Sequence, residues 1–260
     1  MQENMQNPAG NVNNNAPQGI NKNLALVCLT VVAICAIASG TILLMGSKSS
    51  TTVGANQPTN NQPTGPVKVS MDDDAVLGSA TAPVTMIEFS DYECPYCKRH
   101  FMEVFPDIKK DYIDTGKLKM VFRDFIAVPA HNPLATSEAL AADCAKELGG
   151  DSAYFKYHDA LYTKTKSNGN GLLLSDLPVM AKSLGLNVPT FQACLDSQKY
   201  KNEIAKDNAD ALAVLPQGNA GTPSFFIGKS SVDGTINGTM VVGAQPYANF
   251  KAVIDAALAQ

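Results

Sequence analysis

The chain has 260 residues, of which 45% are hydrophobic and 17% charged, so it is long enough to bury a full core and too apolar to be disordered throughout. Its formal net charge is −4 at pH 7. An acidic chain of this kind lacks the excess of lysine and arginine that binds phosphate-rich partners, and we therefore expect no nucleic-acid partner.

The first 45 residues divide into two segments of opposite character. Residues 1–23 are rich in Asn and Gln and have no hydrophobic periodicity, which predicts a disordered N-terminal segment. Residues 24–45 contain no charged side chain. Because roughly 20 apolar residues span the hydrocarbon core of a bilayer, this run predicts a single transmembrane helix that acts as a signal anchor.

A cleaved signal peptide is the main alternative to an anchor, since residues 36–38 (Ala-Ile-Ala) resemble a cleavage site. Apolar residues resume at 41–45, which favours a span that stays on the protein. Cys28 and Cys35 each follow a large residue where a lipoprotein site has a small one. We therefore expect these two cysteines to face lipid or a packed helix, with palmitoylation as the alternative.

Residues 46–70 are rich in Ser, Thr, Asn, Gln, Gly and Pro, which predicts a flexible linker between the span and a folded domain at 71–260. Lys22 and Lys48 flank the span on its two sides. The distribution of positive charge therefore does not fix which side of the membrane carries the domain.

The folded domain opens with a strand-helix-strand pattern. Residues 84–89 form a short apolar run with β-branched members, which predicts a buried strand. Apolar residues at three- and four-residue spacing in 101–108 predict a helix, which Pro106 should kink or end. Residues 118–126 predict a second strand.

A helical insertion at about 131–215 is expected to follow the second strand. Asn132–Pro133 predicts the start of its first helix and Gly149–Gly150 the end of that helix. Further helices are predicted at 152–163, at 177–184 and, after Pro189, from 191 to about 215. The domain should close with strands at 224–227 and 240–242 and a last helix opened by Pro246.

Two cysteines, Cys94 and Cys97, follow the first predicted strand at the spacing shared by zinc sites, haem attachment sites and redox centres. Haem attachment requires His directly after the second cysteine, where this chain has Lys98. A structural zinc site needs four ligands, and His100 as a third candidate still leaves the site one ligand short. The pattern favours a redox pair and predicts no metal and no cofactor.

The predicted position of the pair fits redox chemistry. Cys94 lies at the carboxyl end of a strand and the N-terminus of a helix, where free backbone N–H groups and the helix dipole stabilise a thiolate. Pro95 suits the first helical turn, and Lys98 adds positive potential that Glu93 opposes. We therefore predict that Cys94 is an exposed nucleophile and that Cys97 resolves the mixed disulfide.

Residues 88–92 (Glu-Phe-Ser-Asp-Tyr), followed by Cys94-Pro95-Tyr96-Cys97, and residues 221–226 (Gly-Thr-Pro-Ser-Phe-Phe) resemble the two hallmarks of the DsbA-like family of thiol-disulfide oxidoreductases. The similarity extends over nearly all of 72–260. It implies an α/β thioredoxin-like fold with a helical insertion. It also implies a cis bond at Thr222–Pro223 that faces the cysteine pair and leaves the Thr222 backbone free to bind an extended substrate peptide.

Tyr96 is a departure from the strong oxidants of that family, which have His at this position. Cys-Pro-Tyr-Cys also resembles glutaredoxins and some disulfide isomerases, so the motif does not settle the direction of electron flow. A glutaredoxin is disfavoured by the predicted span and by the helical insertion.

The leading hypothesis is an oxidase anchored in the cell membrane, with its catalytic domain outside the cytoplasm, that passes the Cys94–Cys97 disulfide to unfolded or reduced exported proteins. The family resemblance implies a quinone-linked membrane protein as its reoxidant. A disulfide isomerase or reductase using the same pair is the first alternative. A tethered peptide-binding chaperone without catalysis is the second.

Cys144 and Cys194 lie on apolar helix faces, where two buried free thiols are one interpretation. An oxidising compartment favours a structural disulfide between them, and some relatives carry cysteines in similar places. The three histidines, His100, His131 and His158, are expected to be structural. His100 lies about 240° round the helix from Cys94, and no acid-base partner is evident in the sequence for His131 and His158.

Overall fold

The computed structural model describes residues 65–260. The predicted N-terminal segment, the predicted span at 24–45 and most of the predicted linker lie outside the described residues. Within 65–260, no helix combines the length and the apolar character needed to cross a membrane.

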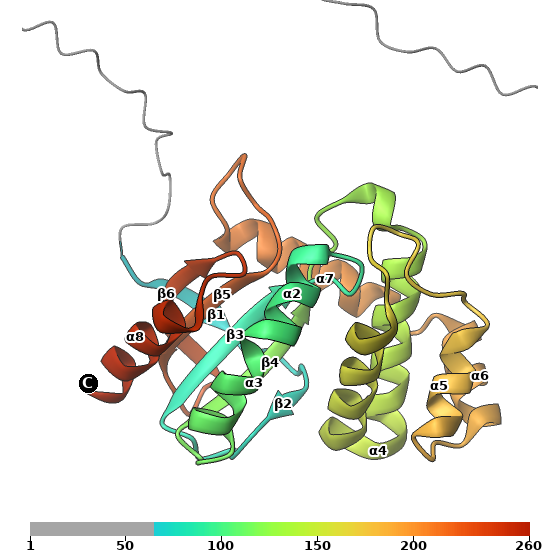
Figure 1. Cartoon of the computed structure of the whole chain (residues 1–260), viewed down its shortest axis with the longest axis horizontal. Coiled ribbons are helices and arrows are strands. Elements are labelled where there is room, and N and C mark those ends of the chain that lie inside the picture. The colour runs from blue at the N-terminus through green and yellow to red at the C-terminus, as the bar shows by residue number, and fades with distance from the viewer. Residues whose placement is uncertain (1–64) are drawn as a thin grey trace, which may run out of the picture. The chain divides into compact units, whose positions relative to one another are not determined.

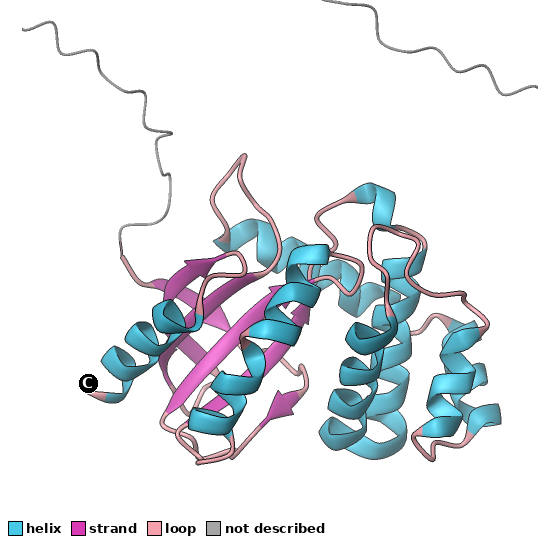
Figure 2. Ribbon diagram, viewed as in Figure 1, coloured by secondary structure: helices cyan, strands magenta, loops and turns pink. Residues whose placement is uncertain are grey.

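A six-stranded sheet forms the centre of the domain, in the order β1-β6-β5-β3-β4-β2 (Figures 1 and 2). Its strands are β1 (Val67–Ser70), β2 (Val76–Leu77), β3 (Val84–Ser90), β4 (Leu118–Asp124), β5 (Ser224–Lys229) and β6 (Thr235–Val242). β3 pairs parallel with β4 and antiparallel with β5. Every residue of β3 and β4 is buried, because both faces of the sheet are covered at its centre.

The helix after β3 is broken in the way that Pro106 predicts. Two helices follow β3, α2 (Pro95–Glu103) and α3 (Phe105–Ile108), and a π-helical turn, η1 (Lys109–Ile113), continues α3. Val104, between them, has φ −119° and ψ −45°, away from helical values. Pro106 has no backbone N–H to continue the α2 hydrogen-bond ladder, and it lies in the first turn of the new helix, which begins at Phe105.

The helical insertion lies between β4 and β5. A 3₁₀ turn, η2 (Pro129–His131), leads into α4 (Leu134–Lys164), α5 (Asp176–Ser183), α6 (Val188–Ser197) and α7 (Lys201–Val214). Gly149 and Gly150 have non-helical backbone angles and divide α4 into two limbs, as predicted. The prediction of a single helix from 191 to about 215 was wrong, because two helices, α6 and α7, occupy this region. Gln198 adopts a left-handed conformation with φ 50°, which ends α6 before α7 begins.

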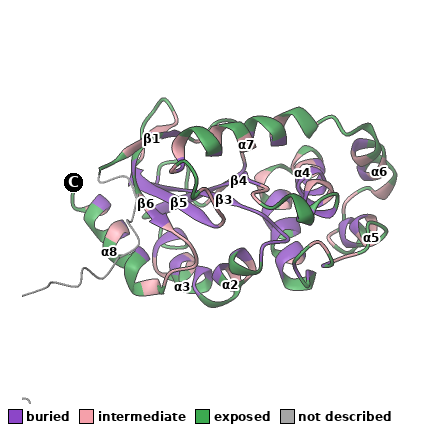
Figure 3. Ribbon diagram, turned by 90° about the horizontal axis from the view of Figure 1, so that it is seen from above, coloured by how far each residue is buried: buried purple, intermediate pink, exposed green. Residues whose placement is uncertain are grey.

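The helices cover the sheet on both faces (Figure 3). Met86 of β3 packs in the core cluster that contains Ile108 of α3 and Phe250 of the last helix, α8 (Tyr247–Leu258). Ile87, the next residue, packs in the opposite cluster with Ala211 of α7. The alternation along β3 thus assigns successive side chains to two different helical layers.

Two strands were missed in the sequence analysis, and one lies at the end of the predicted linker. β1 pairs antiparallel with β6, with Val67 opposite Gly238. β2 has two residues and pairs with β4. Strands of two to four residues are too short for period-two alternation to identify, and their partners lie far along the chain. Residues 67–70 are therefore part of the sheet and not of a flexible linker.

Candidate active site

Cys94 is the N-cap residue of α2, at the end of the short loop that follows β3. Its backbone is extended, with φ −79° and ψ 122°, and Pro95 begins the first helical turn. The backbone N–H of Lys98 donates to the Cys94 carbonyl oxygen at 3.1 Å, so the helical ladder starts at this residue. The structure thus places the pair at the helix terminus that the sequence predicted.

The two thiols are free and differ in their access to solvent. Cys97 is fully buried, whereas Cys94 retains 5% exposure beside the exposed residues Pro95 and Tyr96. Cys94 is therefore the more accessible of the two but less exposed than predicted. The reason is the loop at Thr222–Pro223, whose peptide bond is cis and whose Thr222 carbonyl oxygen lies 3.4 Å from Cys94 Sγ.

The pair divides into a stabilised thiolate and a buried thiol. A hydrogen bond from the Cys97 thiol lowers the pKa of Cys94 to about 6, against the opposing effect of burial. The Thr222 side chain and the backbone N–H groups of Cys97 and Tyr96 add to the lowering. Burial, followed by the hydrogen bond to Cys94, raises the pKa of Cys97. At neutral pH the nucleophile is thus Cys94, and the proton stays on Cys97.

Lys98, which the sequence analysis expected to add positive potential at Cys94, directs its ammonium group elsewhere. Lys98 Nζ contacts the carbonyl oxygen of Thr165, in the loop after α4. The lowered pKa of Cys94 is accounted for by its hydrogen bonds to Cys97, Thr222 and the first turn of α2.

A buried acid beneath the pair was missed in the sequence analysis. Burial raises the pKa of Glu88, on β3, to about 8, and its hydrogen bond to Ser90 opposes that effect. Ser90 also hydrogen-bonds Cys97, so one hydroxyl contacts both the carboxyl and the resolving thiol. The sequence signal was a single acidic residue inside an otherwise uncharged strand, which must be buried if the strand is central.

The loop before Cys94 is held by Asp91. Its carbonyl oxygen accepts the N–H of Cys94 at 3.0 Å, and its Oδ1 accepts the N–H of Glu93 at 2.8 Å. Asp91 Oδ2 lies 2.6 Å from Nδ1 of His131, which is also buried. The expectation that His131 has no acid-base partner was therefore wrong, because the partner comes from a strand end 40 residues earlier in the chain.

The other two histidines lie among aromatic side chains. His100 is buried between Phe225 and Phe250, and burial lowers its pKa to about 3, so it is neutral at physiological pH. His158 packs against Phe122 and has Asp159 Oδ1 at 3.0 Å, so the expectation that it has no acid-base partner was also wrong.

Cys144 and Cys194 are joined by a disulfide that links α4 to α6. Both residues are buried in the main core cluster. The second cysteine pair therefore lies within the helical insertion, apart from the redox pair.

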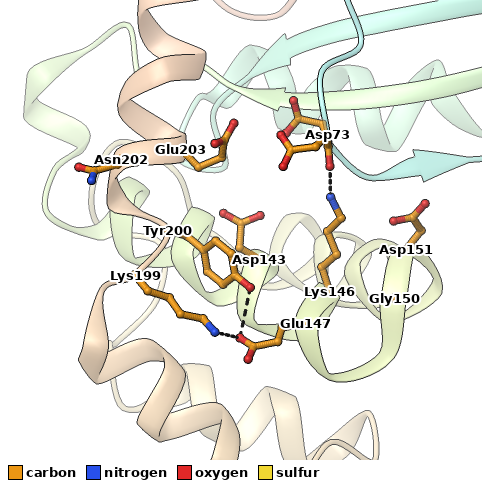
Figure 4. Close-up of a pocket in the computed structure, with 11 residues that line it drawn as sticks. Asp73, Asp143, Lys146, Glu147, Gly150, Asp151, Lys199, Tyr200, Asn202 and Glu203 are labelled. Carbon is orange, nitrogen blue, oxygen red and sulfur yellow. Dashed lines mark hydrogen bonds and ion pairs between the residues drawn. The ribbon is translucent and has the colours of Figure 1, made fainter. Parts of the chain in front are cut away.

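An acidic pocket lies between the start of the domain and helices α4 and α7 (Figure 4). Its lysines are already paired, since Lys199 Nζ lies 2.6 Å from Glu147 and Lys146 contacts the carbonyl oxygen of Asp73. Burial raises the pKa of Asp143 in this pocket to about 7. No cysteine lines it, so it is separate from the thiol chemistry.

Comparison with known proteins places the folded domain in one family. The family profile described as Thioredoxin matches residues 70–256. A "Putative protein-disulfide oxidoreductase" of Rickettsia felis is 31% identical over 180 residues, which cover 66% of this chain and 60% of that protein. The "Disulfide bond formation protein D" of Bacillus subtilis is 35% identical over 138 residues, which cover 51% of this chain and 59% of that protein. The chain thus spans about 60% of the length of these curated relatives.

Solved structures show the same architecture. The oxidised BdbD of Bacillus subtilis aligns with a TM-score of 0.62 and 26% identity, over 75% of this chain and 100% of that chain. The α-DsbA1 of Wolbachia pipientis aligns with a TM-score of 0.59 and 27% identity, over 74% of this chain and 94% of that chain.

Proposed function

This chain belongs to the thioredoxin family, in its DsbA-like branch, and from that membership we propose that it is a protein thiol-disulfide oxidoreductase that works through Cys94 and Cys97. The observation that carries the proposal is the asymmetry of the pair. Cys94 has a lowered pKa and partial exposure at the N-terminus of α2, and Cys97 is a buried thiol behind it.

The proposed reaction starts from the oxidised enzyme, in which Cys94 and Cys97 form a disulfide. A substrate thiolate attacks Cys94 Sγ, the Cys94–Cys97 bond breaks, and Cys97 leaves as a thiolate that takes up a proton. A second substrate thiolate then attacks the substrate sulfur of the mixed disulfide and expels Cys94 as a thiolate. Two electrons pass from the substrate, which gains a disulfide, to the enzyme, which is left reduced.

Three groups around the pair support these steps. The Thr222 carbonyl oxygen, 3.4 Å from Cys94 Sγ, lies where the backbone of an extended substrate peptide could pair with this loop. Ser90 hydrogen-bonds both Cys97 and Glu88. Its hydroxyl therefore links the Cys97 thiol, which gains or loses a proton in the reaction, to the buried carboxyl of Glu88.

We assign the direction of an oxidase to this reaction. The thiolate exists only in the reduced enzyme, so each contact that stabilises it makes the disulfide a stronger oxidant. Tyr96, in place of the His of strong oxidants, favours a moderate potential. Equilibration with glutathione buffers tests the direction. A potential near the thioredoxin value of roughly −270 mV would indicate a reductase, although the chain would remain an oxidoreductase.

The proposed place of work is the outer side of the cell membrane. The uncharged run at 24–45 supports an anchor, and the Cys144–Cys194 disulfide supports an oxidising compartment. The proposed substrates are reduced exported proteins, and the proposed reoxidant is a quinone-linked membrane protein. Protease added outside intact cells should digest residues beyond 70, whereas digestion only after lysis would refute this orientation.

A further inference from the structure

Glu138, on α4, is a buried acid that the proposed reaction does not use. Its side chain is fully buried, and among the described residues neither of its carboxyl oxygens has a hydrogen-bond donor. An ionised carboxylate without donors or a counter-ion is strongly unfavourable in such a place. The group is therefore expected to hold a proton.

Two carboxyl groups act on Glu138: that of Glu93, the residue directly before Cys94, which is within hydrogen-bond reach, and that of Asp91, which acts through its charge. Glu93 is also fully buried, but it has donors. Its Oε1 accepts from the Thr165 hydroxyl at 2.5 Å, and its Oε2 accepts from the backbone N–H of Gly171 at 3.1 Å. Both carboxyl oxygens of Glu93 thus accept hydrogen bonds. Two carboxyl groups can hydrogen-bond each other only if one holds a proton, and Glu138 is the one without donors.

On the basis of the proposed function, we propose that Glu138 is a protonated carboxylic acid that donates a hydrogen bond to the Glu93 carboxylate, and that it is thereby a positioning residue for the redox loop. Burial, followed by the charge and hydrogen bond of Glu93, raises the pKa of Glu138 to about 10, in agreement with the geometry. Glu138 keeps its proton, donates the hydrogen bond to Glu93 and takes no part in thiol exchange.

The contacts of Glu93 explain what this hydrogen bond positions. The Glu93 carbonyl oxygen accepts the N–H of Asn168 at 2.7 Å, so its backbone and side chain both bind the loop at 165–171. A Cβ atom at Gly171 would overlap Glu93 and Thr165, so the approach requires glycine. Lys98 contacts the carbonyl oxygen of Thr165. The insertion is thus fastened to residues on both sides of Cys94, and α4 packs beside α2 (Figure 1).

The proton on Glu138 also sets the local charge. With the proton, the pair carries one negative charge beside the N-terminus of α2. Without it, the pair would carry two. A second negative charge near Cys94 would disfavour its thiolate. The hydrogen bond from Glu138 and the absence of a second negative charge therefore both favour the Cys94 thiolate.

Two substitutions of similar size separate this role from simple packing. Glu138→Gln keeps a neutral donor of the same shape, whereas Glu138→Met keeps the volume and removes the donor. Glu138→Gln should retain the parent's Cys94 pKa, redox potential and slow hydrogen exchange at the N–H groups of Asn168 and Gly171. Glu138→Met should speed exchange at both N–H groups at least tenfold and raise the Cys94 pKa by about half a unit. Glu147→Gln, on the exposed side of α4, is the matched control and should change none of these.

Infrared difference spectroscopy tests the protonation directly. The parent at pH 7 should show the carbonyl band of a protonated carboxylic acid that is absent in Glu138→Gln, a result that does not depend on Glu138→Met folding. The proposal is overturned if no such band belongs to Glu138, or if Glu138→Gln shifts exchange and Cys94 pKa as far as Glu138→Met. Neither measurement requires turnover, so they remain decisive even if the oxidoreductase function itself were refuted by thiol-exchange assays.

Discussion

The two cysteine pairs within residues 65–260 lie in different structural settings. Cys94 and Cys97 occupy the N-cap and first turn of α2, where backbone N–H groups are free to stabilise a thiolate. Cys144 and Cys194 lie within α4 and α6, where the helical ladder already uses the backbone N–H groups. Two cysteine thiols thus form an exchangeable pair in one setting and a structural disulfide in the other. Secondary structure, more than the sulfur chemistry, sets the difference.

Substitution of the redox cysteines should have the largest effect. Cys94→Ser should abolish thiol oxidation, because the Cys94–Cys97 disulfide that substrate thiolates attack cannot form. Cys97→Ser should accumulate mixed disulfides with substrates, because the enzyme thiol that would attack Cys94 Sγ and release the substrate is missing. A thiol-oxidation assay with a reduced protein measures the first outcome, and non-reducing electrophoresis after mixing the reduced variant with a disulfide-containing protein, whose disulfide the Cys94 thiolate attacks, measures the second. If Cys94→Ser accumulated the mixed disulfides and Cys97→Ser did not, the assigned roles would be reversed.

The features that sequence reasoning identified around this pair are local ones. The strand before Cys94, the helix after it and the Thr222–Pro223 motif each depend on residues within a few positions, and the structure brings these segments together. Apolar period and turn chemistry are sufficient for such features.

The features that it missed depend on distant partners. His131 was assigned no partner, yet it pairs with Asp91 across 40 residues. β1 was assigned to a linker, because its pairing with β6 is invisible in four residues. Glu88 and Glu138 were overlooked, since their importance comes from burial that only the assembled layers create. A single sequence does not show which distant residues pair with each other or which polar side chains become buried.

Removal of the structural pair should give the second largest effect, on stability and not on exchange. Because the bridge closes a loop with a sequence separation of 50, Cys144→Ala with Cys194→Ala should lower the free energy of unfolding by up to about 4 kcal/mol. Denaturant unfolding measures the loss, and a thiol-oxidation assay on the folded protein is the control. Equal stability of the double variant and the parent, or a lost exchange activity in the folded variant, would contradict the division between the two pairs.

The buried acid beneath the redox pair should give a smaller, pH-dependent effect. The pKa of Glu88 is raised from 4.5 to about 8, so the folded state holds a proton that the unfolded state releases. The stability from this proton is fully present below pH 4.5 and is lost as the pH rises to about 8. Glu88→Gln should therefore be more stable than the parent at pH 7, on the order of 3 kcal/mol, with little difference at pH 4.

Thermal or denaturant unfolding from pH 4 to 8 measures this difference. The oxidised protein is the right form, because the Cys94 thiolate also raises the pKa of Glu88. Parallel stability curves for Glu88→Gln and the parent would mean that Glu88 is ionised in the folded state.

The smallest expected effect concerns the contact between Cys94 and Thr222. Lowering the pKa of Cys94 from 9.0 to about 6 stabilises the reduced enzyme at pH 7 by about 1.4 kcal/mol, or about 30 mV of redox potential. Thr222→Val removes one of the hydrogen bonds responsible, so it should raise the Cys94 pKa and make the enzyme less oxidising by a fraction of that 30 mV. The pH dependence of Cys94 alkylation and glutathione equilibration measure the two shifts. They should agree through the linkage between thiolate stability and potential, and the Cys144–Cys194 disulfide should be unchanged. If the parent's Cys94 titrated near 9.0, hydrogen bonding at the helix terminus would not distinguish the two pairs.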